Sequence, residues 1–220
     1  MTFFKNATDY SKVSFEPGVA LFYKITVMQL NLFRERTKQL EQGQYEFFIL
    51  ISPSYAIKEK VAEKKHQLHK EIGISNENLR SIAHVSLFKF LNPYPEDFLR
   101  ESIKRSVQFL KPFTLEIEGL QVYDHNYTRS IVLKFKNDLQ VKRLQQNLFR
   151  ALSFYPGNFD PHLTIARSIP LEDFNRIQDL NDYVIEGKFE CNKVTILKKP
   201  LGSKQKYEVF GEVMFPQIGG

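Results

Sequence analysis

The sequence predicts an α+β protein that is bilobal, with a pseudo-twofold repeat of β-α-β-α-β units. We expect two antiparallel sheets around a central cleft, with the helices outside. Three observations favour this fold. From residue 45 onward, strand-like apolar segments alternate with amphipathic segments of helical period, this order of elements occurs twice, and each half contains one strand with an unusual polar face. At 220 residues, the chain is long enough for one compact domain or two small lobes.

Residues 1–44 match neither half of the repeat. They contain a β-prone run from Val19 to Met28 and a modest helical stripe that can end near Gly43. We therefore assign residues 1–44 as an N-terminal extension of unknown function. Residues 45–215 form the predicted domain, whose closely packed halves lie at about 45–123 and 129–215.

The first half begins with a nearly continuous apolar run, which is typical of a strand covered on both faces. Ser52 and Pro53 follow it and predict the N-cap and first turn of a helix. Gly119 indicates a bulge in the last strand of this half. The elements expected here are, in order, a strand at 46–52, a helix to about residue 72, a strand at 82–90, a helix from about residue 96 and a strand at 113–122.

The second half repeats this order after a short loop. Asp138 can cap its first helix, and Pro170 can open its second. The elements expected here are a strand at 130–136, a helix from about 139 to 152, a strand at about 161–167, a short helix after residue 170, and β segments at 183–197 and 206–215. Sequence identity between the halves is low. Only one short motif, which occurs in both, shows how the two halves align with each other.

That motif is His, apolar, Ser or Thr, apolar. It occurs at 84–87 and again at 162–165. Because side chains alternate across a strand, His84 and Ser86 point to one face, and His162 and Thr164 likewise share a face. The apolar residues between them can enter the core. Two lobes that place these strands side by side would bring both His and hydroxyl pairs to one cleft.

Composition favours an anionic partner without proving one. The chain has 31 Lys and Arg against 25 Asp and Glu, a net charge of +6 and a pI near 9.2. Such a balance is typical of proteins that bind nucleic acid or phosphorylated metabolites. The basic residues are spread over several helices and mixed with Glu, so a merely well-solvated surface is an equal interpretation.

The sequence also limits the class of protein. A single cysteine, Cys191, excludes an internal disulfide and a cysteine-based metal site, which fits a reducing compartment. No segment has the form of a signal peptide, and none approaches the roughly 20 apolar residues that span a bilayer. His66 and His69 are three residues apart, but without a third ligand we expect them to face solvent. We expect a cytoplasmic monomer that does not bind membranes and requires no metal.

The sequences His84-Val85-Ser86-Leu87 and His162-Leu163-Thr164-Ile165 resemble the twin signatures of the 2H phosphoesterase superfamily, which includes the 2′-5′ RNA ligase-like proteins, or RNA 2′,3′-cyclic phosphodiesterases. The resemblance covers roughly residues 45–215. Pro161 before the second motif and Arg167 after it also match, while the first copy has Ser where Thr is commoner. The resemblance implies action on a 2′,3′-cyclic phosphate or a 2′-5′ linkage in RNA or a nucleotide, without ATP.

The residue types support the same chemistry. Opening a cyclic phosphodiester requires one group to take a proton from water and another to protonate the leaving sugar oxygen, and histidine can do either near neutral pH. We expect His84 and His162 to be this catalytic pair, with the roles of base and acid left open. Ser86 and Thr164 would donate hydrogen bonds to the phosphate oxygens. The scheme requires no cofactor and no metal.

Two further residues are candidates for substrate contact. The resemblance makes Arg167 a phosphate neighbour if its strand ends or twists there, although strict alternation points Arg167 and Lys89 away from the histidine face. A salt bridge or a solvated position is the alternative for Arg167. Tyr155 lies in a loop near a strand end, where its ring could stack on a base or pack at the rim.

The sequence thus predicts a metal-independent phosphodiesterase of RNA ends or small cyclic nucleotides, with reverse 2′-5′ ligation as a related activity. Three alternatives stay open. They are a phosphodiesterase of 2′-5′ oligonucleotides, a non-catalytic module that binds RNA or nucleotide phosphate, and a structural domain in which the two histidines lie far apart.

Overall fold

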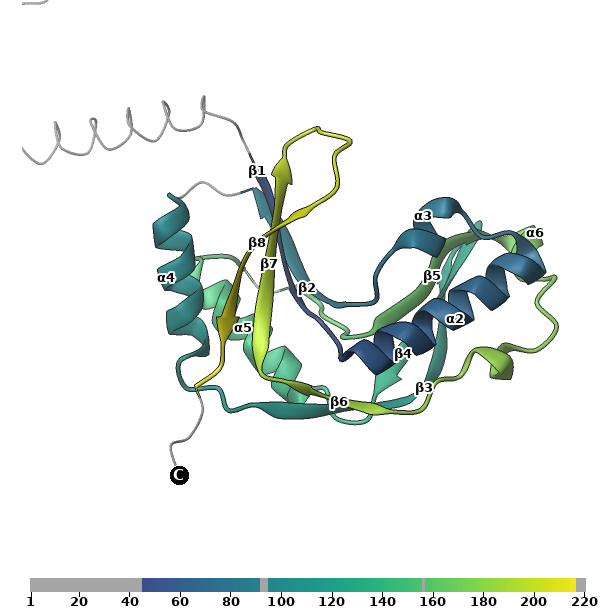
Figure 1. The fold of residues 1–220 in the computed structure, drawn as a ribbon, viewed down its shortest axis with the longest axis horizontal. Coiled ribbons are helices and arrows are strands. Elements are labelled where there is room, and N and C mark those ends of the chain that lie inside the picture. The colour runs from purple at the N-terminus through teal and green to yellow at the C-terminus, as the bar shows by residue number, and fades with distance from the viewer. Residues whose placement is uncertain (1–44, 92–94, 156, 217–220) are drawn as a thin grey trace, which may run out of the picture. The chain divides into compact units, whose positions relative to one another are not determined.

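The computed structural model describes residues 45–91, 95–155 and 157–216 (Figure 1). The strand and helix expected within residues 1–44 lie outside the described residues. Within the described ranges, no helix is both long and apolar enough to cross a membrane.

The order of elements along the chain follows the predicted alternation of strands and helices. The described residues contain eight strands, five α-helices and one 3₁₀-helix: β1 Tyr45–Ile51, α2 Tyr55–Ile72, α3 Asn76–Arg80, β2 Val85–Leu91, α4 Glu96–Val107, β3 Phe113–His125, β4 Thr128–Phe135, α5 Leu139–Ala151, β5 Leu163–Pro170, α6 Leu171–Phe174, η1 Leu180–Tyr183, β6 Lys188–Cys191, β7 Lys193–Pro200 and β8 Glu208–Met214.

The first long helix shows how local sequence sets the boundaries. The hydroxyl of Ser54 accepts a hydrogen bond from the backbone N–H of Ile57 at 3.5 Å, so Ser54 is the N-cap of α2. The predicted cap at Ser52 is therefore wrong by two residues. At the other end Gly73 adopts a left-handed conformation, with φ at 75°, and its N–H bonds to the carbonyl of His69. Glycine tolerates this conformation and ends the helix there.

All eight strands form one antiparallel sheet in the order β6-β3-β4-β5-β2-β1-β7-β8. The prediction of an α+β fold is confirmed, but the prediction of two separate sheets is not. The reason lies at the centre of the sheet, where β2 and β5 are joined by a single residue pair, Val85 and Leu163. Four strands lie on each side of this joint. The strands next to it are β1 and β2 on one side and β4 and β5 on the other, and in each pair the two strands are connected in sequence through helical segments.

Strand pairing crosses between the two halves of the sequence. β3 comes from residues 45–123, yet it pairs with β4 and β6. β7 comes from residues 129–215, yet it pairs with β1. The expected β segment at 183–197 is divided at Asn192 into β6 and β7, which lie on opposite sides of the central joint. The proposed lobe boundaries remain a prediction about the repeat in the sequence.

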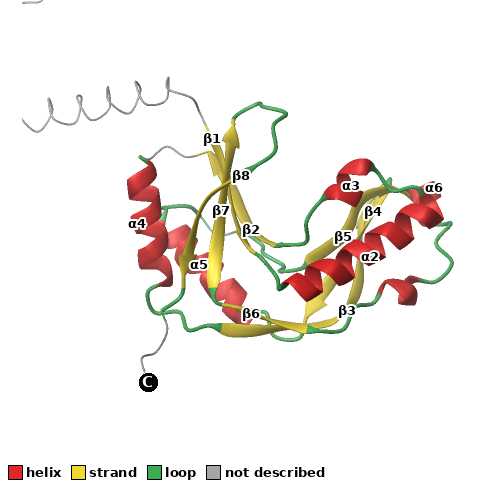
Figure 2. Cartoon of the chain, viewed as in Figure 1, coloured by secondary structure: helices red, strands yellow, loops and turns green. Residues whose placement is uncertain are grey.

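The helices cross over in the same way. α2 lies between β1 and β2 in sequence, yet it contacts β5, and α6 contacts β4 and β5 (Figure 2). α4 and α5 lie against each other near β8. From α5, the amide of Gln145 donates to the carbonyl of Leu87 in β2 at 2.8 Å. α2 and α5 thus reach strands on the other side of the joint from the strands that flank them in sequence, which ties the two sides together.

Candidate active site

The central joint of the sheet positions both histidine motifs. Val85 and Leu163 face each other in an antiparallel register, and each is fully buried in the core. Since side chains alternate along a strand, the residues before and after this pair point to the opposite face of the sheet. In an antiparallel pair, the residue before one member lies across from the residue after the other.

This register predicts that each histidine neighbours the hydroxyl of the other motif. His84 is set beside Thr164 in this way. Ser86 is set beside His162. All four side chains line one cavity of about 480 Å³. The structure therefore brings together the four residues that the sequence singled out most strongly.

Both imidazole rings are held by the same contact. The Nδ1 atom of His84 lies 2.7 Å from the carbonyl oxygen of Ile82, and that of His162 lies 2.7 Å from the carbonyl oxygen of Asp160. A carbonyl only accepts, so Nδ1 carries the proton in each ring. The Nε2 atoms, which have no hydrogen-bond partner among the described residues, remain available to take or give a proton.

An aromatic ring supports each histidine from the side. Phe48 meets His84 edge to face, with ring centroids 5.2 Å apart. Tyr123 meets His162 in the same geometry at 5.3 Å. These contacts restrict rotation of the imidazoles and leave both rings half-buried.

Burial lowers the pKa of both histidines, because it disfavours the charged imidazolium. Nearby cations lower the pKa of His84 further, chiefly Lys65, then Lys89 and Arg167, although its hydrogen bond to Ile82 acts in the opposite direction. At His162 the additional cation is Lys134. A bound phosphate would reverse these effects by stabilising the charged form.

Each motif strand contains a β-bulge that brings a cationic side chain into the cavity: Arg167 from β5 and Lys89 from β2. Between β4 and β5, Val132 pairs with Thr164 but the preceding Ile131 pairs with Ala166, so β5 contains an extra residue. The alternation therefore shifts, and Arg167 lines the cavity. The sequence expectation from strict alternation, which pointed Arg167 away from the histidines, does not hold.

The same shift occurs in β2. Leu50 pairs with Ser86, whereas the preceding Ile49 pairs with Phe88, so β2 also has an extra residue. Lys89 consequently lines the cavity with Ser86. The motif is thus longer than the sequence indicated, with a cation five residues after each histidine.

A hydrogen-bond network around the buried residues Lys65 and Asn78 links β5 to the segment that precedes β2, and the sequence pattern did not reveal it. The side chain of Asn78 in α3 accepts from the backbone N–H of Arg167 at 3.0 Å and donates to the backbone carbonyl of Arg167 at 2.9 Å. Lys65 is only 1% exposed, and its amino group donates to the carbonyl oxygen of Ser81 at 2.6 Å and to its hydroxyl at 2.5 Å. The Ser81 hydroxyl donates in turn to the carbonyl of Asn78.

A signal for Lys65 was present in the sequence. Lys65 stands on the apolar stripe of α2, between Val61 and Leu68, where a lysine is out of place. Burial and neighbouring Arg167 lower its pKa to about 8. No comparable signal marked Asn78, because α3 itself was not predicted.

The remaining candidates lie elsewhere. Tyr155 is 94% exposed and is not among the residues that line the cavity. His69 bonds through Nδ1 to the carbonyl of Ile74 at 2.7 Å, and His66 is exposed. Across the described ranges, no group of three or more His, Cys, Asp or Glu side chains is arranged to hold a metal ion.

Comparison with known proteins identifies the family of the chain and proteins that share its fold. The model of a family described as the 2′-5′ RNA ligase superfamily matches residues 57–202. Among solved structures, E. coli LigT complexed with phosphate is 16% identical, with a TM-score of 0.57 over 80% of this chain and 99% of that chain. LigT complexed with 3′-AMP is 16% identical, with a TM-score of 0.54 over 79% of this chain and 99% of LigT.

A Thermus thermophilus protein, TT0787, is 15% identical, with a TM-score of 0.55 over 77% of this chain and 97% of that chain. No curated protein sequence matches the chain. At such low identity the structural likenesses establish the shared fold, whereas the family match covers more than half of the chain. The chain therefore belongs to the 2′-5′ RNA ligase superfamily and so to the 2H phosphoesterases.

Proposed function

We propose that this protein is a metal-independent phosphodiesterase that opens 2′,3′-cyclic phosphates at RNA ends or in small nucleotides. The observation that carries the proposal is the pair of imidazoles, His84 and His162, which are held by equivalent backbone contacts and line one cavity. Neutral Nε2 of one ring can act as general base, and protonated Nε2 of the other can act as general acid.

The reaction requires one proton to be taken and one to be given. The base removes a proton from water as the water oxygen bonds to phosphorus. The bond from phosphorus to one sugar oxygen breaks, and the acid protonates that oxygen. When a ribose 5′-hydroxyl replaces water as the nucleophile, the base takes the proton of that hydroxyl, its oxygen bonds to phosphorus, the bond from phosphorus to the 3′-oxygen breaks and the acid protonates that oxygen, which accounts for 2′-5′ ligation as a related activity.

Charge that develops on the phosphate oxygens needs donors that are already in position. Ser86 and Thr164 line the cavity beside the imidazoles and supply hydroxyl donors. Arg167 supplies a guanidinium that forms no ion pair among the described residues, and Asn78 fixes its backbone. We place these three groups around the non-bridging oxygens of the substrate.

The substrate class rests on the fold and the charge of the cavity. LigT shares the fold and has been solved in complex with 3′-AMP and with phosphate, which supports a nucleotide phosphate as the ligand. The cavity also has Tyr123 and Tyr207 in its wall, which can contact a base or ribose. That the protein is a monomer and that it is located in the cytoplasm both remain predictions.

The test is hydrolysis of a nucleoside 2′,3′-cyclic phosphate by the purified chain, with and without a chelator. We expect turnover that the chelator does not reduce. A 2′-5′-linked dinucleotide measured in parallel separates the two phosphodiesterase activities. Absence of turnover on both substrates, together with salt-dependent RNA binding that survives loss of both histidines, would replace the proposal with a non-catalytic phosphate-binding module.

A further inference from the structure

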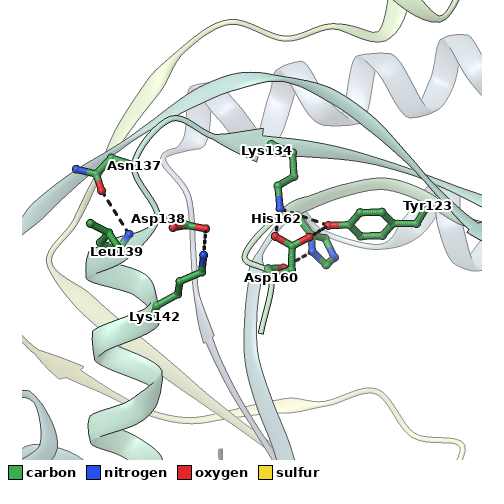
Figure 3. Close-up of polar contacts among 8 residues, drawn as sticks. All are labelled: Tyr123, Lys134, Asn137, Asp138, Leu139, Lys142, Asp160 and His162. Carbon is green, nitrogen blue, oxygen red and sulfur yellow. Dashed lines mark hydrogen bonds and ion pairs between the residues drawn. The ribbon is translucent and has the colours of Figure 1, made fainter. Parts of the chain in front are cut away.

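The two ends of the cavity differ in charge. At the His162 end, the amino group of Lys134 forms an ion pair with the carboxylate of Asp160 and lies 3.4 Å from the hydroxyl of Tyr123 (Figure 3). The Tyr123 hydroxyl also donates to Asp160. The cation at this end is therefore already neutralised by a carboxylate of the protein.

At the His84 end the cations are not neutralised in this way. Among the described residues, Lys89 forms no ion pair with a carboxylate, and its amino group lies 4.8 Å from the ring centroid of Phe48 and 5.5 Å from that of Tyr207. Lys199 lies 4.9 Å from the ring centroid of Tyr207. Its one carboxylate neighbour in the described part of the chain is Glu46, at the loose distance of 3.8 Å.

Tyr207 gives a second, independent indication of a ligand. It lines the cavity, yet its hydroxyl is buried and has no hydrogen-bond partner among the described residues. A buried hydroxyl without a partner is costly, and such groups are rare in folded proteins. An acceptor that enters this end of the cavity would satisfy it.

The strand register shows where these groups lie relative to the histidines. Lys89 pairs with Phe48 across β1 and β2, and Glu46 pairs with Lys199 across β1 and β7. Lys89, Glu46 and Lys199 therefore lie on three neighbouring strands, β2, β1 and β7, all on the side of the joint that contains the first motif. Because of the bulge in β2, Ser86 pairs with Leu50 and Lys89 with Phe48, which are two residues apart on β1, so the two positions are about 7 Å apart along the strand. That separation accommodates a nucleoside between two phosphates.

We infer that Lys89, Lys199 and Tyr207 form a second phosphate subsite, so that the preferred substrate is a nucleoside cyclic phosphate with a further phosphate on its 5′ side. This inference rests on the proposed function, because it takes the first phosphate to lie between the histidines. The further phosphate belongs to a 5′-phosphorylated mononucleotide or to the next nucleotide of an RNA chain. Phosphate oxygens would accept hydrogen bonds from the two ammonium groups and the tyrosine hydroxyl.

The electrostatics of Lys89 agree with an anion at this position. Burial lowers the pKa of Lys89, and Arg167 and Lys199 lower it further, while Glu46 acts in the opposite direction. The site thus holds like charges close together without a sufficient counterion of its own. A phosphate dianion would relieve this repulsion.

The experiment is calorimetric titration of the full chain with adenosine 3′-phosphate and with adenosine 3′,5′-bisphosphate, neither of which contains the cyclic phosphate that the proposed reaction opens. We expect the bisphosphate to bind about tenfold more tightly. In Lys89→Met and in Lys199→Met this ratio should fall toward one. Lys193→Met is the matched control, because Lys193 lies on β7 as well but pairs with Glu212, and it should keep the wild-type ratio.

Two further arms sharpen the result. Glu46→Gln removes the competing carboxylate and should increase the preference for the bisphosphate. A dinucleotide with a 3′-terminal phosphate, whose internal phosphate bears one charge, distinguishes an RNA end from a 5′-phosphorylated mononucleotide by its affinity relative to the bisphosphate.

Equal affinities in the wild type, or a preference that survives both lysine substitutions, would overturn the inference. Failure of the proposed function would give a different result. No cyclic phosphate would be hydrolysed, whatever the ratio of the affinities for the bisphosphate and the monophosphate.

Discussion

The two motif strands are alike in geometry and different in charge. On each strand the histidine bonds to the carbonyl two residues before it, an aromatic ring packs at its side, a hydroxyl follows two residues later, and a bulge brings in a cation five residues later. Around His162 the cation Lys134 is paired with Asp160, whereas at the His84 end Lys89 forms no ion pair among the described residues and Lys199 has only the loose contact with Glu46 at 3.8 Å.

This comparison separates two roles of the fold. The shared geometry comes from backbone register and bulges, which hold the two imidazoles in equivalent positions; in our proposal they are the base and the acid on either side of one phosphate. The difference in charge comes largely from side chains around the motif, since Lys134 is paired with Asp160 near His162 while Lys199 lies against Tyr207 near His84, and we propose that this difference decides on which side the rest of the substrate lies. We therefore expect equivalent substitutions in the two motif strands to reduce activity by similar amounts. Substitutions of the surrounding charged residues should change the properties of one end of the cavity only.

The largest effect is expected from the histidines. His84→Ala and His162→Ala should each reduce kcat/KM for a nucleoside 2′,3′-cyclic phosphate by about 10³-fold, because each removes one proton transfer. The double variant should be little worse than either one, since the pair acts as a unit. His66→Ala is the control on the exposed face of α2. A single variant with near-normal turnover would break the equivalence of the two strands.

The hydroxyls should follow with a smaller loss. Ser86→Ala and Thr164→Val should each lower kcat by about 10²-fold, because each removes one donor to the charge that develops on phosphate. Steady-state kinetics with the same substrate measures the loss. If KM rose while kcat stayed constant, the hydroxyls would serve binding alone.

The pH dependence tests the shared burial of the rings. The rate should rise as the base loses its proton and fall as the acid loses its own, which gives a bell-shaped profile. Because burial lowers both pKa values below the ordinary value of 6.5, the maximum of kcat/KM should lie below pH 6.5. The profile of kcat should lie at higher pH, since bound phosphate favours the charged imidazole. A flat profile from pH 5 to 9 would contradict paired proton transfer.

The smallest effect is expected on the pKa of one histidine, His84. Lys65→Met removes a buried cation that lowers the pKa of His84, so the pKa of His84 should rise while that of His162 stays unchanged. Titration of the imidazole signals by NMR reads both at once. Lys64→Met, one residue away with its amino group bonded to Gln67, is the control. Equal shifts at both histidines would mean that the two environments are not independent.

Local periodicity was sufficient to predict the parts of the site that lie next to each other in sequence. Alternation along a strand placed His84 with Ser86 and His162 with Thr164, and the structure has all four in one cavity. Gly119 was predicted to mark a bulge, and the register of β3 does shift between Ile117 and Gly119. These features depend on neighbours within a few residues.

Features that depend on distant partners could not be predicted in this way. The exchange of β3 and β7 across the joint follows from strand pairing over long separations. Arg167 and Lys89 reach the cavity because bulges form against β4 and β1, and a bulge depends on the partner strand. Asn78 acts on the backbone of Arg167, 89 residues away.

The central claim is that two imidazoles share one phosphate. It is tested most directly by NMR titration of both histidine side chains in the presence and absence of adenosine 3′-phosphate. We predict that one equivalent of ligand raises the pKa values of His84 and His162 together, because both Nε2 atoms then face the same anion. If only one histidine responds, or neither does, the two rings do not act on one phosphate.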